Sequence, residues 1–186
     1  MTMTPMQDVS QLDGGGGDME RPAQQFLRFS VGADAYAVRI ELVREILEVG
    51  QMTPLPLMPT FVRGVMNLRG AVVPVVDLSA RLGMDPTTIG RRTCVIMVGL
   101  SGAQGAQHMG VLVDAVQEVF DVDDGCVESV PRMGTKIDPS FIAGMVRVRG
   151  LVTPALDFER TLAEQTLAEL IAQGQPGANH AVAATV

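Results

Sequence analysis

Short apolar runs separated by glycine, proline and polar residues make up most of this chain. Residues 26–31 and 35–40 are two such runs on either side of a Gly-Ala-Asp turn, a pattern that predicts a β-hairpin. Residues 41–44 can form one helical turn, after which 45–49 reads as extended again. Residues 53–59 contain three prolines and cannot form a helix. The pattern therefore predicts strands, with little helix in this part of the chain.

A second predicted hairpin comprises residues 61–68 and 71–76, joined by a tight turn at Arg69-Gly70. Pro74 cannot donate to a strand ladder, so its strand is expected at an edge or a bulge. Asp77 suits the N-cap of a short helix over Leu78–Leu82, which Gly83 would end in a left-handed conformation.

The chain contains a duplication. Residues 59–78 recur as 139–158, an offset of 80, and residues 36–47 are echoed by 109–120, an offset of 73. One longer loop in the second copy, 121–138 against 48–58, accounts for the difference. A long period present twice predicts two similar small domains side by side, with a seam between them where a ligand or partner could bind.

The second copy repeats the plan of the first. Strands are expected at 93–99, 108–113 and 116–122, followed by a hairpin at 141–156. Five short strands per copy indicate a mainly β fold of two five-stranded β-barrels with short helices. Asp157 is again read as an N-cap, here of a longer C-terminal helix with its apolar positions at Leu162, Leu167, Leu170 and Ile171 and its end at Gly174.

The expected domain organisation follows from these patterns. Residues 1–22 and 173–186 are predicted to be flexible tails, the first because of its glycine run and lack of apolar residues. Residues 23–172 form one domain, whose duplicated units lie near 30–83 and 93–163 and are intertwined at their ends.

Composition narrows the function classes. Hydrophobic residues make up 47% of the chain but aromatic residues only 4%, so the cores must be aliphatic. The net charge is −7, with the acidic excess concentrated in the two ends, which argues against binding to nucleic acid. No apolar run is long enough to span a bilayer and no signal-peptide pattern is present, so a soluble cytoplasmic protein is expected. Cys94 is read as a small core residue.

The sequence offers no set of residues for catalysis, a metal or a cofactor. Its two histidines, His108 and His180, have no ligand or catalytic motif around them, and glycines 14–17 lack the rest of a phosphate-binding loop. The acidic residues near Asp121 do not follow calcium-loop spacing. We therefore expect a protein without enzymatic activity.

The run Phe61-Val62-Arg63-Gly64-Val65-Met66-Asn67-Leu68-Arg69-Gly70, followed by Val73-Pro74-Val75-Val76-Asp77-Leu78, resembles the signature of the CheW family of chemotaxis coupling proteins. Further matching segments are 26–29, 36–38, 43–46, 111–114 and Gly144, so the resemblance covers about 23–172. It implies two five-stranded barrels and an adaptor that joins the tips of chemoreceptors to the regulatory domain of the histidine kinase CheA, in the cytoplasm at membrane-associated receptor arrays.

The resemblance also implies roles for individual residues. Candidates for kinase or receptor coupling are Gly64, Asn67, Arg69 and Gly70, the two glycines mainly through backbone conformation. Candidates for a receptor groove are Val43, Glu45, Gly110 and Val116, although core packing could explain both valines and a solvent-facing acid could explain Glu45. Arg147 and Arg149, which occupy the places of Asn67 and Arg69 in the second copy, form either a second contact surface or a drifted duplicate. Asp77 and Asp157 are read as helix caps.

Two alternatives remain open from the sequence. A coupling protein of this kind could serve a receptor array that controls an output other than swimming. A small-ligand sensor or small enzyme using the seam is the other alternative, and it would need convergent polar groups there.

Overall fold

A computed structural model describes residues 23–102, 105–123, 126–130 and 136–162. The two predicted tails and the predicted helix beyond Leu162 lie outside these residues. The strands are β1 (Gln24–Val31), β2 (Asp34–Arg39), β3 (Val43–Glu48), β4 (Met52–Thr53), β5 (Val62–Leu68), β6 (Ala71–Asp77), β7 (Cys94–Gly102), β8 (Gly105–Val113), β9 (Ala115–Val122), β10 (Ile142–Val148) and β11 (Leu151–Leu156). The helices are α1 (Leu78–Arg81), α2 (Phe158–Thr161) and the 3₁₀ turns η1 (Ile40–Leu42) and η2 (Pro139–Phe141).

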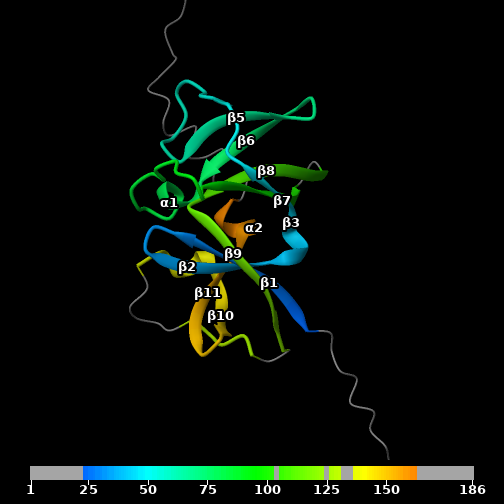
Figure 1. The fold of residues 1–186 in the computed structure, drawn as a ribbon, viewed down its shortest axis with the longest axis vertical. Coiled ribbons are helices and arrows are strands. Elements are labelled where there is room, and N and C mark those ends of the chain that lie inside the picture. The colour runs from blue at the N-terminus through cyan, green and yellow to red at the C-terminus, as the bar shows by residue number, and fades with distance from the viewer. Residues whose placement is uncertain (1–22, 103–104, 124–125, 131–135, 163–186) are drawn as a thin grey trace, which may run out of the picture.

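The strands form two sheets, one above the other in Figure 1. One has five strands in the order β10-β11-β2-β1-β9, and the other has six in the order β3-β7-β8-β6-β5-β4. The mainly β prediction is confirmed. The expected five strands per barrel apply to one sheet only, because Met52–Thr53 in the proline-rich segment pairs with β5 and adds a sixth strand to the other.

The two sheets do not correspond to the two copies of the sequence. The first copy supplies β1–β2 to the five-stranded sheet, where β1 pairs with β9 of the second copy. The second copy supplies β7–β8 to the six-stranded sheet, where β7 pairs with β3 of the first copy. The expected intertwining therefore involves a whole hairpin from each copy and not only their ends. This exchange joins the two copies into one body.

In the described part of the chain, the buried hydrophobic residues form three clusters. The largest lies between the sheets and includes Phe29, Val38, Val98 and Phe158, all fully buried. Each sheet also carries a smaller cluster on the face that points away from this central layer. One is centred on Val146 of the five-stranded sheet and the other on Leu112 of the six-stranded sheet. Because the seam between the sheets is filled with side chains, the main part of it is core and not the binding cleft that the duplication suggested.

This arrangement explains the uninterrupted apolar runs in the sequence. Along β7, Val95 and Met97 face the inside of the six-stranded sheet, whereas Ile96 and Val98 face the layer between the sheets. Successive side chains of a strand point to opposite faces, so a strand buried on both faces has no polar alternation. Cys94 at the start of β7 is half-buried and packs against the central cluster, as predicted.

The turns and caps agree with the sequence. Arg69 and Gly70 have φ of 53° and 89°, the left-handed pair of a two-residue hairpin turn. The Asp77 carboxylate accepts a hydrogen bond from the Ala80 N–H and caps α1. Pro74 is a partial exception, because its strand β6 is internal; pairing with β8 begins only at Val75, so the proline needs no donor on that side.

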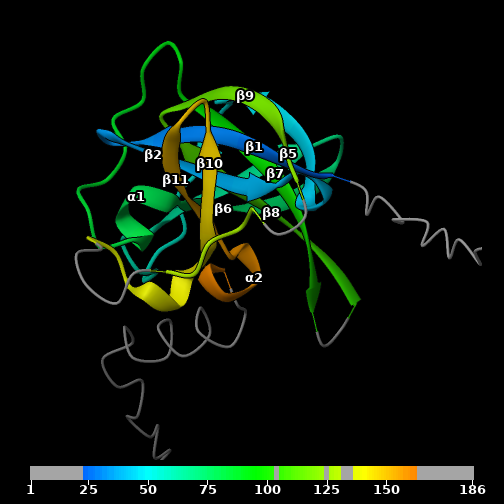
Figure 2. The same cartoon turned by 90° about the horizontal axis from the view of Figure 1, so that it is seen from below.

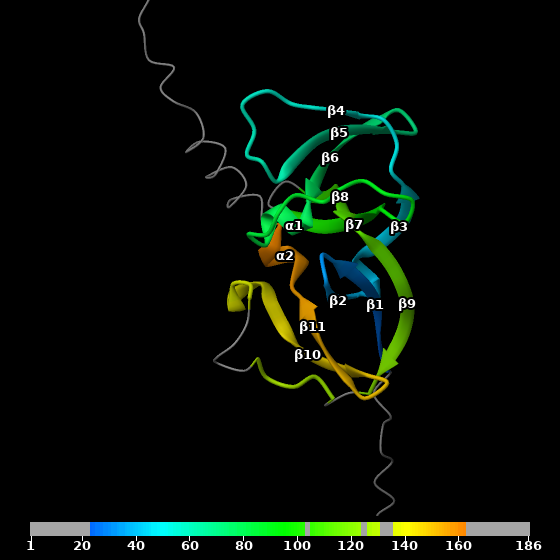
Figure 3. The same ribbon diagram turned by 60° about the vertical axis from the view of Figure 1, so that its left-hand side comes forward.

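The helices α1 and α2 lie between the two sheets (Figure 3), and Figure 2 shows both helices from below. A hydrogen bond from Arg81 of α1 to Thr161 of α2 joins them. Each follows the last strand of a repeated hairpin, β6 or β11, and each begins after an aspartate that accepts a backbone hydrogen bond. Within the described segments, no helix has the length and apolar character needed to cross a bilayer.

Candidate functional site

Arg69, at the tip of the β5–β6 hairpin, forms an ion pair with Glu45 on β3. Its Nη2 lies 2.8 Å from Oε1 of Glu45, and the arginine side chain is 77% exposed. Strand β3 is an edge of the six-stranded sheet and is not a neighbour of β5 or β6. The ion pair therefore links the hairpin tip to an edge strand elsewhere in the same sheet. The sequence indicates Arg69 as a candidate for kinase or receptor coupling and Glu45 as a candidate for a receptor groove, and the structure brings these two residues together.

The same arrangement occurs in the second copy. Arg149, at the tip of the β10–β11 hairpin, places Nη2 2.8 Å from Oε2 of Glu118 on the edge strand β9. Arg149 lies 80 positions after Arg69, and Glu118 lies 73 after Glu45, which are the two offsets of the duplication. Glu118 also lies 3.6 Å from Arg28 of β1. Each sheet thus presents an arginine held at a hairpin tip by an edge-strand glutamate.

Exposed aliphatic side chains accompany both ion pairs along the chain. Val72 follows the first turn and Ile46 follows Glu45; Val152 and Val119 are their counterparts in the second copy, and all four are exposed. We call the first set, Glu45, Ile46, Arg69 and Val72, the Arg69 surface. We call the second set, Glu118, Val119, Arg149 and Val152, the Arg149 surface. Along β3 and β9 the aliphatic residue points to the opposite face of the strand from the glutamate before it, so each set lies around the edge of its sheet and not on one face. Arginine is enriched at protein-binding surfaces.

The structure places Val43 and Val116 differently from Glu45. Both are half-buried, and both pack against the central cluster, Val43 opposite Val98 and Val116 opposite Phe29. Their contacts are those of core residues at the margin of the layer between the sheets.

Gly110 of β8 is buried inside the six-stranded sheet. A Cβ there would lie 2.8 Å from a methyl group of Val95 and 3.1 Å from one of Val75. Its side of the strand faces the sheet interior, so the structure does not bring Gly110 onto an exposed groove with Glu45. Glycine is needed at this position for close packing.

The remaining candidates shape the hairpin that carries Arg69. Gly64 has φ of 138° and sits where a Cβ would collide with the backbone oxygen of Thr53 on β4. The Gly70 N–H donates to Oδ1 of Asn67, 2.9 Å away, within the turn. In the second copy Arg147 replaces Asn67 and instead pairs with Glu128 at 3.0 Å.

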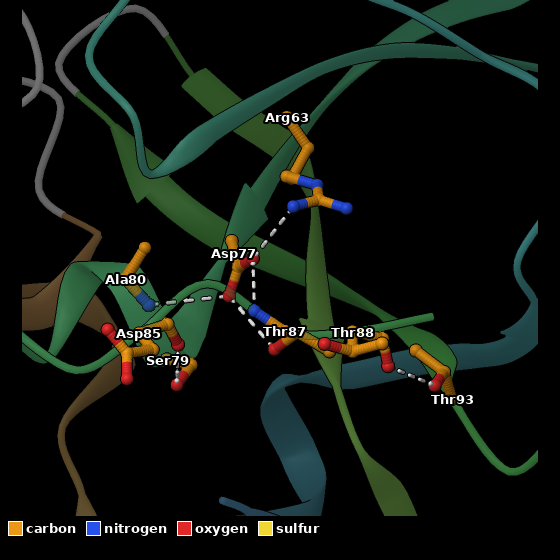
Figure 4. Close-up of polar contacts among 8 residues, drawn as sticks. All are labelled: Arg63, Asp77, Ser79, Ala80, Asp85, Thr87, Thr88 and Thr93. Carbon is orange, nitrogen blue, oxygen red and sulfur yellow. Dashed lines mark hydrogen bonds and ion pairs between the residues drawn. The ribbon is translucent and has the colours of Figure 1, made fainter. Parts of the chain in front are cut away.

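The sequence identified Asp77 as a cap but missed the network around it (Figure 4). The Asp77 side chain is fully buried, and its carboxylate accepts from both the N–H and the hydroxyl of Thr87, at 2.9 and 3.0 Å. Arg63 of β5 lies 3.5 Å away on the other side. The carboxylate thereby fixes the segment after α1 to the sheet. Nothing in the local spacing links Thr87 to Asp77, since the bond depends on how that segment folds back.

A cavity of about 240 Å³ lies near the start of α2, with Leu42, Ala143, Leu156, Asp157 and Glu159 among its lining residues. Here Ala143 stands where the first copy has Arg63, which leaves the second cap aspartate without that partner. The volume is below the ~300–1,000 Å³ usual for small-molecule sites. The cavity thus gives little support to the small-ligand alternative.

Comparison with known proteins identifies the family. Residues 25–166 match the CheW-like domain. The chain belongs to this family. The chemotaxis protein CheW of Rhizobium meliloti is 36% identical over 127 residues, which cover 68% of this chain and 79% of that protein. The chemotaxis protein CheW of Klebsiella aerogenes is 27% identical over 166 residues, covering 89% of this chain and 95% of that protein.

A solved structure supports the same assignment. The scaffolding protein TtCheW of Thermoanaerobacter tengcongensis superimposes with a TM-score of 0.67 at 28% identity, over 75% of this chain and 88% of that one. The family proposed from the sequence is therefore confirmed.

Proposed function

We propose that this chain is a non-enzymatic adaptor that couples chemoreceptors to a CheA-like histidine kinase in chemotaxis signalling. The relatives named as chemotaxis proteins, and one named as a scaffolding protein, support this function. The observation that carries it is the repeated arginine–glutamate pair, one on each sheet of a single body. An adaptor needs two binding surfaces at a fixed separation, and the Arg69 and Arg149 surfaces meet that need.

The ion pairs add little to the stability of the fold. Exposed arginine–carboxylate pairs contribute about 0–1 kcal/mol, and both arginines are more than three-quarters exposed. Guanidinium groups carry five N–H donors, so pairing with one carboxylate leaves several available. Glu45 holds the Arg69 side chain in one orientation and thereby reduces the entropy lost when a partner binds. We infer that the pair positions Arg69 for a partner.

The proposed arrangement places the kinase regulatory domain and the receptor tip on this one molecule, in the cytoplasm beside membrane-associated receptor arrays. Coupling through the Arg69 surface involves Gly64, Asn67 and Gly70 as the residues that shape the hairpin. The Arg149 surface, with Arg147 beside it, supplies the second contact. Exposed aliphatic residues on both surfaces would provide the apolar contact area.

The test replaces Arg69 and then exchanges the two charges. We expect Arg69→Glu to weaken coupling by about 2 kcal/mol or more, because a partner contact is lost and a charge is reversed. The double variant Arg69→Glu with Glu45→Arg restores an internal ion pair but leaves the wrong charge at the hairpin tip, and we expect it to remain defective. Receptor-dependent kinase activity in a reconstituted mixture measures both.

Two results would contradict the proposal. Unchanged kinase activation by Arg69→Glu would show that the surface is not used. Full activity of the double variant would show that the ion pair matters only within the chain. The matching substitution Arg149→Glu, tested in the same mixture, asks whether the second surface is used as well.

A further inference from the structure

Arg81, the last residue of α1, extends from the six-stranded sheet to the five-stranded one. Its Nε donates to the backbone carbonyl of Thr161 in α2 at 2.8 Å. Its guanidinium carbon lies 4.6 Å from the centre of the Phe141 ring and 5.5 Å from that of Phe61. Phe61 precedes β5 and Phe141 precedes β10, so this one side chain contacts elements that belong to both sheets.

The two copies of the sequence differ at the position of Arg81. Phe61 and Phe141 are equivalent residues in the two copies, and Arg81 and Thr161 are equivalent as well, each pair being 80 positions apart. Equivalent elements thus meet around a single arginine that only the first copy supplies. Two arginines here would place like charges close together, whereas a single arginine can donate to the backbone carbonyl of residue 161 without a second cation beside it.

Arg81 is half-buried, which makes this position less favourable for a cation than an exposed one. Desolvation lowers the pKa of Arg81, partly offset by the nearby carboxylate of Asp138, which raises it. Its Nη2 is buried and has no hydrogen-bond partner among the described residues. A buried donor without a partner costs about 1–3 kcal/mol, so simple packing would favour an apolar residue here.

The layer between the sheets otherwise consists largely of aliphatic and aromatic contacts. Such contacts depend on the area removed from water and have little directional preference. The Arg81–Thr161 hydrogen bond and the position of the guanidinium over two rings are directional. They can therefore fix the angle between α1 and α2, and with it the angle between the sheets.

We propose that Arg81 is a positioning residue that sets the relative orientation of the two sheets and so of the Arg69 and Arg149 surfaces. The first part of the proposal concerns the fold alone. The second part rests on the proposed adaptor function. The adaptor function, as proposed, also has the two bound partners in contact with each other; their joint binding then depends on the angle between the two surfaces and is weakened when that angle changes.

The direct test measures the distance between the sheets in the whole chain. Cysteines introduced at Gln51 and Gln117, exposed positions near β4 and in β9, carry spin labels in a background with Cys94→Ala and Cys126→Ser. With Arg81 present we expect one narrow distance distribution. With Arg81→Thr, which makes the two copies alike at this position, we expect a broader or shifted distribution. Arg92→Thr, at an exposed arginine, is the matched control and should change nothing.

Arg81→Lys keeps the charge and the aliphatic stem but loses the planar guanidinium. It serves as the second variant if Arg81→Thr does not fold, and we expect a smaller broadening in the same direction. An unchanged distribution in a folded Arg81 variant overturns the proposal.

Measurements of partner binding distinguish a failure of this inference from a failure of the adaptor proposal. Arg81→Thr should bind each partner alone within about twofold of the parent chain, yet retain the two partners together about tenfold less well. If the parent chain binds neither partner, the adaptor proposal fails, while the distance measurement still decides the role of Arg81. Equal loss of every single-partner affinity would contradict positioning and indicate a general loss of structure.

Discussion

At the scale of single residues, Gly64 is the glycine of the described segments whose added Cβ would lie nearest to backbone atoms. Its φ of 138° is strained for any L-residue with a Cβ, and that Cβ would collide with the Thr53 backbone. We expect Gly64→Ala to lower the free energy of unfolding by about 3 kcal/mol. Gly32→Ala is the control: its φ is 60°, and nothing lies within 4 Å of the added Cβ. It should cost only about 1–2 kcal/mol.

Urea unfolding followed by circular dichroism measures both glycine variants. Equal destabilisation by the two substitutions would contradict the role of close packing at Gly64.

The two cap aspartates give a second prediction at this scale. Asp77 is fully buried with four donors around its carboxylate, whereas Asp157 is 24% exposed and accepts from its own helix. Asp77→Asn places an amide N–H₂ against buried donors and should cost about 2–3 kcal/mol. Asp157→Asn should change stability by less than about 0.5 kcal/mol, because asparagine is an equally good N-cap. Thermal unfolding of the Asp77→Asn and Asp157→Asn variants tests this prediction. Similar losses of stability in the two variants would show that the hydrogen bonds from Thr87 to Asp77 add nothing beyond helix capping.

The residue scale also shows what sequence could and could not predict. The cap at Asp77 follows from local spacing, and so does the turn at Arg69-Gly70. The ion pair between Arg69 and Glu45 does not, because 24 residues separate them and their contact depends on how the sheet curves. A signal did exist: both residues have charge-conserving counterparts at the two offsets of the duplication, in Arg149 and Glu118.

At the scale of elements, the strand positions other than β4 were predictable from the sequence, but the pairing partners of the strands were not. An apolar hairpin such as β1–β2 can pair with strands of either copy, because the two copies present similar edges. Successive side chains of β7 point alternately into the central cluster and into the cluster of the six-stranded sheet. This burial on both faces could not be predicted from one strand, because it depends on the second sheet packing against the first. The filled seam follows from this exchange of hairpins.

The start of β7 supplies a prediction about reactivity. Cys94 is half-buried, and desolvation raises the pKa of its thiol, whereas Cys126 is exposed. Burial disfavours the thiolate, which is the reactive form, so Cys94 should react with iodoacetamide several-fold more slowly at pH 8. Mass spectrometry of peptides after timed labelling measures the two rates. The difference should disappear in urea; equal rates in the folded chain would contradict a buried Cys94.

At the scale of the whole molecule, exchanged hairpins and a shared central core make the two sheets one body with two similar surfaces. Heterologous contacts between such surfaces and their partners generate rings or extended arrays, depending on the rotation between them. The proposed adaptor function depends on this geometry, because two partners must be held at once.

The most direct test is whether one chain retains both partners. An immobilised receptor cytoplasmic fragment is mixed with a CheA-like kinase, with and without this chain, and bound kinase is quantified. We predict that kinase is retained only when the chain is present, and that Arg69→Glu reduces the retained amount. Equal kinase retention without the chain, or failure of the chain to bind either partner, would contradict the adaptor function.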